Sequence, residues 1–126
     1  MKKIFTEQAP KAIGPYSHAI RSGNLIFCSG QTPLNPQTML IEGATVNEQT
    51  NLVLSNLEIV LKAEGCNRSH IIKTSVFLKN FADFEKMNKA YETFFGDHKP
   101  ARTTVEVSRL PKDALVEIEC VAEVPA

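Results

Sequence analysis

Two segments near the C-terminus alternate between apolar and polar side chains, and this alternation constrains the fold more strongly than any other feature of the sequence. The first segment spans residues 101–107 and the second spans residues 116–124. A period of two residues predicts β-strands, each with one buried face. The predicted buried faces carry Thr103, Val105 and Val107 in the first strand, and Val116, Ile118, Cys120, Ala122 and Val124 in the second. Residues 110–113 between them have turn chemistry, so we expect a β-hairpin.

The parity of this hairpin predicts where its charged side chains lie. If the two strands pair with their apolar faces together, Arg102 and Glu117 share the opposite face. The pattern alone favours a solvated surface with ordinary cross-strand ion pairs, because most charged side chains simply face water. A functional use of this cation and this carboxylate is the alternative.

The composition is typical of a soluble globular domain. The chain has 126 residues, of which 43% are hydrophobic and 22% are charged, so we expect a single domain that spans residues 1–126. The formal net charge is zero, which argues against binding to nucleic acid or to an anionic membrane. No apolar run approaches the roughly 20 residues of a membrane span. The first residues also lack the apolar stretch of a signal peptide, so we expect a cytoplasmic protein.

The cysteine and histidine residues do not show the spacing of a metal site. They are Cys28, Cys66, Cys120, His18, His70 and His98. No C-x-x-C pair occurs, and two of the cysteines fall in apolar strand patterns, which predicts buried thiols. We therefore expect no bound metal. The common phosphate-binding and nucleophile motifs are absent from the sequence.

Short strands and one long helix are predicted for the first half of the chain. Strand patterns occur at residues 3–6, 16–22 and 24–29, and Gly23 separates the last two as a hairpin turn.

The long helix is predicted at residues 45–64. Thr45 and Glu48 have the spacing of a capping box, in which each side chain bonds an unpaired backbone donor of the first turn. Gly65 is well placed to end the helix with a positive φ. An amphipathic stripe runs along it through Gln49, Leu52, Val53, Asn56, Leu57, Val60 and Leu61.

The strand predicted at residues 70–79 is apolar on both faces. Ile72, Thr74, Val76 and Leu78 are expected on one face, and Ile71, Ser75 and Phe77 on the other. Because one layer of helices covers only one face of a sheet, another subunit is a candidate for the second cover.

A second helix is predicted at residues 81–95, between Asn80 as N-cap and Gly96 as stop. Asn88 is the polar member of its apolar stripe. Two interpretations of Asn88 are equally good: its side chain bonds to backbone at the edge of the stripe, or it contacts a ligand. The order of elements predicts an α+β sandwich, in which one mixed β-sheet has two α-helices packed on one face.

Several motifs, in order along essentially the whole chain, resemble the RidA/YjgF family of reactive intermediate deaminases. They are IGPYS at 13–17, SGQ at 29–31, EQT at 48–50, Asn88 with Tyr91 and the Phe94–Phe95 pair, PAR at 100–102, and RLPKDALVEIE at 109–119. The resemblance implies a chorismate-mutase-like fold and a homotrimer with clefts between subunits. It also implies hydrolysis of 2-aminoacrylate and 2-aminocrotonate, in their enamine and imine forms, to 2-oxo acids and ammonia without a cofactor.

The resemblance also implies roles for individual residues. Arg102 binds the substrate carboxylate, and Glu117 acts on the attacking water. The backbone carbonyl of Thr104 helps to place that water, and the ligand lies near Tyr16, Ser29, Gly30 and Asn88. These roles agree with the chemistry of the side chains, because a planar guanidinium grips a carboxylate through two parallel bonds and a carboxylate can accept a proton from water.

The sequence departs from the family pattern in three places. The link at residues 96–99 is short, Thr104 stands where many members have cysteine, and Met39 stands where a turn glycine is common. These differences concern the shape of the cleft more than the chemistry.

Two other functions remain as alternatives. A metabolite-binding protein that senses 2-oxo acids without turnover needs Arg102 but not Glu117. An endoribonuclease or translation inhibitor is less favoured, because the net charge is zero and the chain has only two tyrosines.

Overall fold

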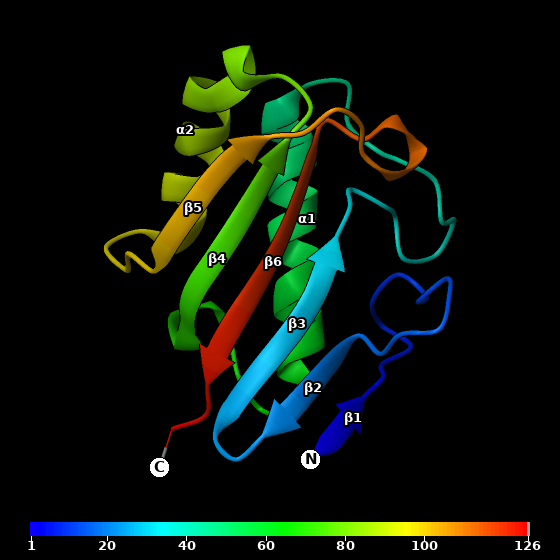
Figure 1. Ribbon diagram of the computed structural model, residues 1–126, viewed down its shortest axis with the longest axis vertical. Helices are drawn as coiled ribbons and strands as arrows, with labels where there is room; N and C mark the ends of the chain where they lie inside the picture. Colours follow the sequence, from blue (N-terminus) through cyan, green and yellow to red (C-terminus); the bar gives the residue numbers. More distant parts are fainter. Residues whose placement is uncertain (126) are drawn as a thin grey trace.

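The computed structural model describes residues 1–125 and shows one six-stranded mixed sheet with two helices on one face (Figure 1). The strands are β1 (Lys2–Ile4), β2 (Ala19–Ser22), β3 (Leu25–Gln31), β4 (Ile71–Leu78), β5 (Ala101–Glu106) and β6 (Val116–Glu123). The helices are α1 (Val46–Lys62) and α2 (Phe84–Phe95), with single 3₁₀ turns at Arg68–His70, Phe81–Asp83 and Pro111–Asp113. The predicted α+β fold is confirmed.

The strands lie in the order β1-β2-β3-β6-β4-β5. Strand β4 pairs with β5 in parallel and with β6 antiparallel, so the predicted hairpin between the last two strands is wrong. Alternation fixes which face of a strand is buried but not which strand lies beside it. Strand β4 has a fully buried face and takes the inner position, whereas β5 has no strongly buried residue and forms the edge of the sheet.

Pairing across β4 also reverses the predicted faces of β5. Arg102 lies opposite Thr74 of β4, which is buried under the helices and lies opposite Cys120 of β6. Arg102 therefore lies on the helix-covered face, whereas Val105 points to the open face and is 41% exposed. The prediction that Thr103, Val105 and Val107 face the core is wrong.

The start of β4 contains a second departure from strict alternation. The register with β6 shifts between Ile71 and Lys73, and this irregularity turns Ile71 into the core and leaves Ile72 43% exposed. The predicted faces are confirmed from Thr74 onward, and wrong for the two isoleucines.

Helix α1 supplies the largest part of the core, and its predicted boundaries are nearly right. The hydroxyl of Thr45 accepts a hydrogen bond from the Glu48 amide at 3.2 Å, and Gly65 has φ 72°. In the part of the chain that the structure describes, neither helix is long and apolar enough to cross a membrane.

Two buried amide side chains on α1 hold the loop that follows β3 and the loop that precedes β6. Asn56 donates to the carbonyl of Leu34 at 2.9 Å. Gln49 donates to the carbonyl of Gly43 at 3.0 Å and accepts from the amide of Leu115 at 2.8 Å. These bonds satisfy backbone groups of loops that would otherwise lose water without gaining a partner.

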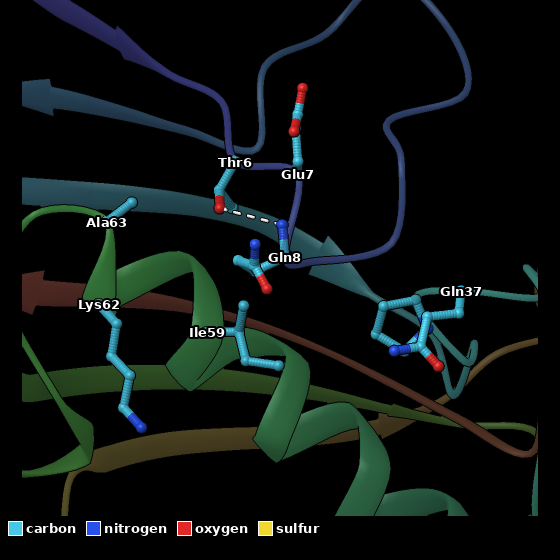
Figure 2. A pocket seen from close by; sticks show the side chains of 8 residues that line it. Thr6, Glu7, Gln8, Gln37, Ile59, Lys62 and Ala63 are labelled. Carbon is cyan, nitrogen blue, oxygen red and sulfur yellow. Dashed lines mark hydrogen bonds between the residues drawn. The ribbon is translucent and has the colours of Figure 1, made fainter.

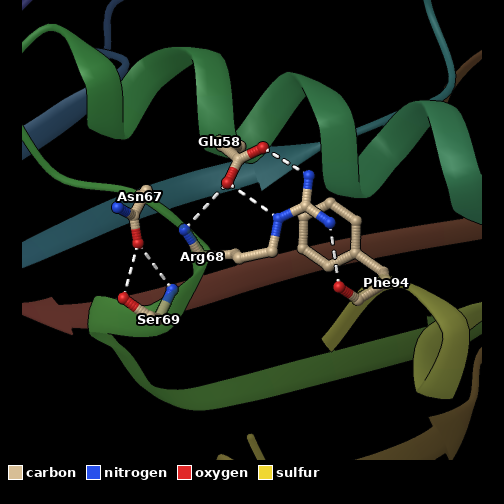
Figure 3. Close-up of polar contacts among 5 residues, drawn as sticks. All are labelled: Glu58, Asn67, Arg68, Ser69 and Phe94. Atoms are coloured by element: carbon tan, nitrogen blue, oxygen red, sulfur yellow. Dashed lines mark hydrogen bonds and ion pairs between the residues drawn. The ribbon is translucent and has the colours of Figure 1, made fainter. Parts of the chain in front are cut away.

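The end of α2 is held by an ion pair that links three elements (Figure 3). The Arg68 guanidinium donates to both carboxylate oxygens of Glu58 on α1, at 2.9 and 2.7 Å. It also donates to the carbonyl of Phe94 at 2.9 Å and lies 3.9 Å from the centroid of the Phe94 ring. The pKa of the Glu58 carboxyl is lowered, chiefly by the hydrogen bond from Arg68 and against the effect of burial.

We predict that Glu58→Gln lowers the free energy of unfolding by about 1–2 kcal/mol at neutral pH, since Arg68 is partly solvated. A carboxyl whose pKa is lowered on folding adds stability above its ordinary value of 4.5 and loses it as the pH falls through the lowered pKa. The difference between the wild type and the variant should therefore shrink below pH 4.5. Urea unfolding across the acid range measures it.

The exposed pair between Arg109 and Asp113, whose side chains are 77% and 74% exposed, is the matched control. Asp113→Asn should change stability little at any pH. An equal loss for both variants would contradict the role given to Glu58.

Candidate functional site

Four of the predicted site residues gather at one hollow on the open side of the sheet. Tyr16, Ser29, Gly30 and Glu117 line a cavity of about 620 Å³. They come from the loop before β2, from the end of β3 and from the start of β6. We call this group the Glu117 half-site.

Gly30 of β3 and Glu117 of β6 are in direct contact between two neighbouring strands. The register between β3 and β6 shifts between Cys28 and Gln31, which forms a bulge at Ser29 and Gly30. A Cβ atom at Gly30 would collide with Oε2 of Glu117. Glycine lets the carboxylate lie directly against the backbone, and a larger residue would displace it from this place.

Glu117 has the electrostatic environment of an acid–base group. Its pKa is raised, first by burial and then by repulsion from the neighbouring Glu119 carboxylate. A carboxyl with a raised pKa accepts a proton more readily than an exposed glutamate does.

Ser29 and Tyr16 are positioned by local backbone contacts. The Ser29 hydroxyl donates to the carbonyl of Ser17 at 2.8 Å. Tyr16 follows Gly14, which has φ 136°, and the Tyr16 amide bonds the Gly14 carbonyl at 2.9 Å. The Tyr16 side chain is 47% exposed, so its ring is available to a ligand or to another subunit.

Two loops with left-handed residues meet at the rim of this hollow. Met39 has φ 61° and Lys112 has φ 55°, and the Lys112 ammonium donates to the Met39 carbonyl at 3.2 Å. A methionine in this conformation carries backbone strain that a glycine would not. The observed φ explains why a turn glycine suits position 39.

Arg102 lies in a second hollow, on the helix-covered side of the sheet. A cavity of about 260 Å³ is lined by Asn88, Tyr91, His98, Lys99 and Arg102, among others. The guanidinium carbon of Arg102 lies 4.8 Å from the centroid of the Tyr91 ring. No hydrogen bond or ion pair in residues 1–125 engages the Arg102 guanidinium. We call this group the Arg102 half-site.

The Tyr91 ring lies beneath Arg102, a role that the sequence motifs did not predict. Its hydroxyl is hydrogen bonded to Thr74 at 2.7 Å, and burial raises its pKa. Tyr91 lies three residues after Asn88 on the same face of α2, which is the signal that could have identified it.

Asn88 and Thr104 each leave a polar atom without a partner among the described residues. Both Oδ1 of Asn88 and the hydroxyl of Thr104 are buried and make no hydrogen bond there. Oδ1 of Asn88 therefore makes no bond to backbone, which favours the ligand interpretation of this residue. A buried acceptor without a partner is costly unless a ligand or water bonds to it.

The two half-sites lie on opposite faces of the sheet. Arg102 is in the row of Thr74 and Cys120, whereas Glu117 is in the row of Phe77. Three rows of about 3.3 Å and two strand spacings of about 4.8 Å separate them, and the odd offset places their side chains on opposite sides. The prediction that Arg102 and Glu117 share a face of one chain is therefore wrong.

Another cavity, of about 560 Å³, lies between the N-terminal segment and α1 (Figure 2). Thr6, Gln8, Ile59 and Lys62 are among its lining residues, and none of the predicted site residues is. In residues 1–125, no group of three or more His, Cys, Asp or Glu side chains is arranged to hold a metal ion.

Comparisons with known proteins agree with the family resemblance of the sequence motifs. The sequence matches the family described as Endoribonuclease L-PSP over residues 6–124. It is 52% identical to a RutC family protein of Pyrococcus horikoshii over 119 residues, which cover 94% of each chain. It is 46% identical over 124 residues to the 2-iminobutanoate/2-iminopropanoate deaminase of Escherichia coli, with 96% of each covered.

Solved structures show the same fold. TdcF of Escherichia coli with bound serine superposes with a TM-score of 0.94 at 41% identity, over 99% of this chain and 100% of the other. The YjgF gene product of Escherichia coli gives 0.93 at 45% identity, over 98% of each. The chain therefore belongs to the Endoribonuclease L-PSP family, also named RidA/YjgF.

Proposed function

We propose that this protein hydrolyses 2-imino acids to 2-oxo acids and ammonia, at sites that form between the subunits of a homotrimer. The observation that carries the proposal is the pair of half-sites. One holds a guanidinium that lies over the Tyr91 ring and has no hydrogen bond or ion pair in residues 1–125, and the other holds a partly buried carboxylate with a raised pKa. The named activity of the Escherichia coli relative supports the same reaction.

The Arg102 half-site suits the carboxylate of a small imino acid. The guanidinium lies over the Tyr91 ring, so its forked N–H donors are presented in a fixed orientation. Oδ1 of Asn88 is a free acceptor in the same cavity, and a substrate N–H group is a matching donor. The substrate is thereby held by its carboxylate with its imine carbon in a defined place.

The Glu117 half-site suits activation of water. Glu117 accepts a proton from the water as the water oxygen bonds to the imine carbon, and returns that proton to the imine nitrogen. In the resulting carbinolamine, Glu117 moves the hydroxyl proton to the amine, the C–N bond breaks and ammonia leaves, which gives the 2-oxo acid. Gly30 leaves room for the carboxylate, and we place the backbone carbonyl of Thr104 near the water. Water is the only co-reactant, so the reaction needs no cofactor.

A second copy of the chain is needed because one substrate cannot reach both half-sites of a single subunit. The open face of the sheet carries Phe27, 47% exposed, and Val105, which gives it the apolar character of an interface. Packing that face against a neighbouring subunit brings the Glu117 half-site of one chain toward the Arg102 half-site of the next. A cyclic trimer closes three such contacts.

Mixed subunits test this arrangement. Arg102→Ala and Glu117→Gln should each be nearly inactive, but chains unfolded and refolded together should recover about one quarter of wild-type activity. Each site takes its arginine from one subunit and its glutamate from another. In a random mixture, each of these two residues is intact with a probability of about one half, so about one quarter of the sites hold both. The readout is release of 2-oxo acid when a threonine dehydratase supplies the imine. No recovery in a mixture that light scattering shows to be trimeric would contradict a shared site.

Arg102→Lys should lose nearly as much activity as Arg102→Ala. Lysine keeps the charge but not the fork, so about 2–5 kcal/mol of transition-state binding should be lost in both variants. Because the guanidinium also packs on Tyr91, Arg102→Ala should lower stability by about 0.5–1 kcal/mol. Lys99→Ala removes an exposed cation of the same cavity and is the control. Near-wild-type turnover by the lysine variant would mean that charge alone suffices.

Glu117→Gln should lower turnover by about 10²–10⁴-fold without loss of stability. Because folding raises the pKa of Glu117, the ionised form is disfavoured in the folded state, and the amide should leave stability equal or slightly higher at neutral pH. As the pH decreases, wild-type turnover should begin to fall while the pH is still above 4.5, the ordinary pKa of a glutamate, because Glu117 with its raised pKa becomes protonated there. The control is Glu119→Gln in the same cavity, which should stay active.

A metabolite sensor without catalysis makes a different prediction. It would bind 2-oxo acids through Arg102 and would be indifferent to Glu117→Gln, and wild-type protein would not accelerate loss of the imine. The coupled assay therefore separates the two functions.

A further inference from the structure

The buried imidazole of His18 bonds to Thr6 and Pro10, on either side of a turn in the N-terminal segment. His18 is only 4% exposed. Nδ1 accepts a hydrogen bond from the Thr6 amide at 3.1 Å, and Nε2 lies 2.7 Å from the carbonyl oxygen of Pro10. Since a backbone N–H donates to Nδ1, the ring proton is on Nε2 and the ring is neutral.

The backbone next to this ring is bonded to the Glu117 half-site. The carbonyl of His18 accepts from the Ser29 amide at 3.0 Å, and the carbonyl of Ser17 accepts from the Ser29 hydroxyl. Ser29 precedes Gly30, which lies against the Glu117 carboxylate. The ring of His18 and its own backbone thus connect the segment at residues 6–16 with the bulge that seats Glu117.

Few hydrogen bonds hold the segment at residues 7–16, in which Ala9 is buried in the core at 2% exposed. A cavity of about 720 Å³ lies against it, lined by Phe5, Lys11, Gly14, Tyr16 and His18 among others. In the described part of the chain, the bond from Nε2 of His18 to Pro10 is the only hydrogen bond that ties residues 7–16 to anything beyond residue 6 and the segment itself.

We propose that His18 is a positioning residue that holds Tyr16 in the Glu117 half-site. Its two ring bonds fix both ends of a turn, and Tyr16 follows that turn at the edge of the site. The part of this inference that concerns turnover rests on the proposed function. The part that concerns the segment does not, because hydrogen exchange and proteolysis report on it directly.

Two variants separate the hydrogen bonds from the volume of the ring. His18→Phe keeps an aromatic ring against Phe5, whose ring centroid lies 6.1 Å away, but removes both bonds. His18→Gln keeps one donor and one acceptor. The matched control is His70→Phe, because His70 also accepts a backbone N–H through Nδ1, from Asn67 at 2.9 Å, on a turn that lines neither half-site.

His18→Phe should raise the exchange rate of the Thr6 amide and the rate of tryptic cleavage after Lys11 by about tenfold. It should also lower kcat/KM for the imine by about tenfold, while Arg102-dependent binding of 2-oxobutanoate is kept. His18→Gln should restore most of each value, and His70→Phe should change none. Unchanged exchange and cleavage in His18→Phe would overturn the proposal, as would equal defects in the glutamine variant.

Measurements on the wild-type protein keep the proposal testable if His18→Phe does not fold. Nitrogen NMR of the His18 ring should show the neutral form protonated on Nε2, and the Thr6 amide should be protected. A ring protonated on Nδ1, or a Thr6 amide that exchanges as fast as that of Lys11, would refute it. Absence of imine turnover in the wild type would instead refute the proposed function, and exchange and cleavage would still decide the role of His18.

Discussion

The position of β4 between β5 and β6 is the constraint on which the site depends. Backbone hydrogen bonds on both edges of β4 fix the rows in which Arg102 and Glu117 lie, and the offset between those rows is odd. An odd offset in a pleated sheet puts the two side chains on opposite faces. The guanidinium is consequently committed to the helix-covered side and the carboxylate to the open side, whatever their rotamers. A single chain therefore does not present the two groups on one face.

The Arg102 half-site holds polar groups without partners in residues 1–125, and the Glu117 half-site holds a partly buried carboxylate. The Arg102 guanidinium lacks a carboxylate, Oδ1 of Asn88 lacks a donor, and the pKa of the partly buried Glu117 is raised. Such groups cost stability and are found where function requires them. The packing of α1 on β3 and β6 offsets this cost, with Val53, Leu57 and Leu61 fully buried. Two further buried oxygens without a partner in residues 1–125, the Thr50 hydroxyl and Oδ1 of Asn56, lie on α1 outside both half-sites.

Side chains that bond to backbone give the loops around the site their shape. Gln49 and Asn56 project from α1 to hold the loops after β3 and before β6. His18 does the same for the segment before β2. At the other end of the sheet, Arg68 fixes the end of α2 and hence the short link to β5. A few directional hydrogen bonds from these side chains, rather than packing, thus hold the loops in place against the rigid elements.

The sequence by itself determined the local elements and the family. Alternation and helical periodicity predicted the strands, both helices, the Thr45 cap and the glycine stops, because these depend on interactions between residues close in the chain. The motifs pointed to Arg102 and Asn88 in one half-site and to Tyr16, Ser29, Gly30 and Glu117 in the other. Only the tertiary structure decided that β4 separates β5 from β6 and that Arg102 packs on Tyr91. A strand pattern states which side chains share a face, but its neighbour is chosen by burial and hydrogen bonding across the whole sheet. Residues distant in sequence make that choice.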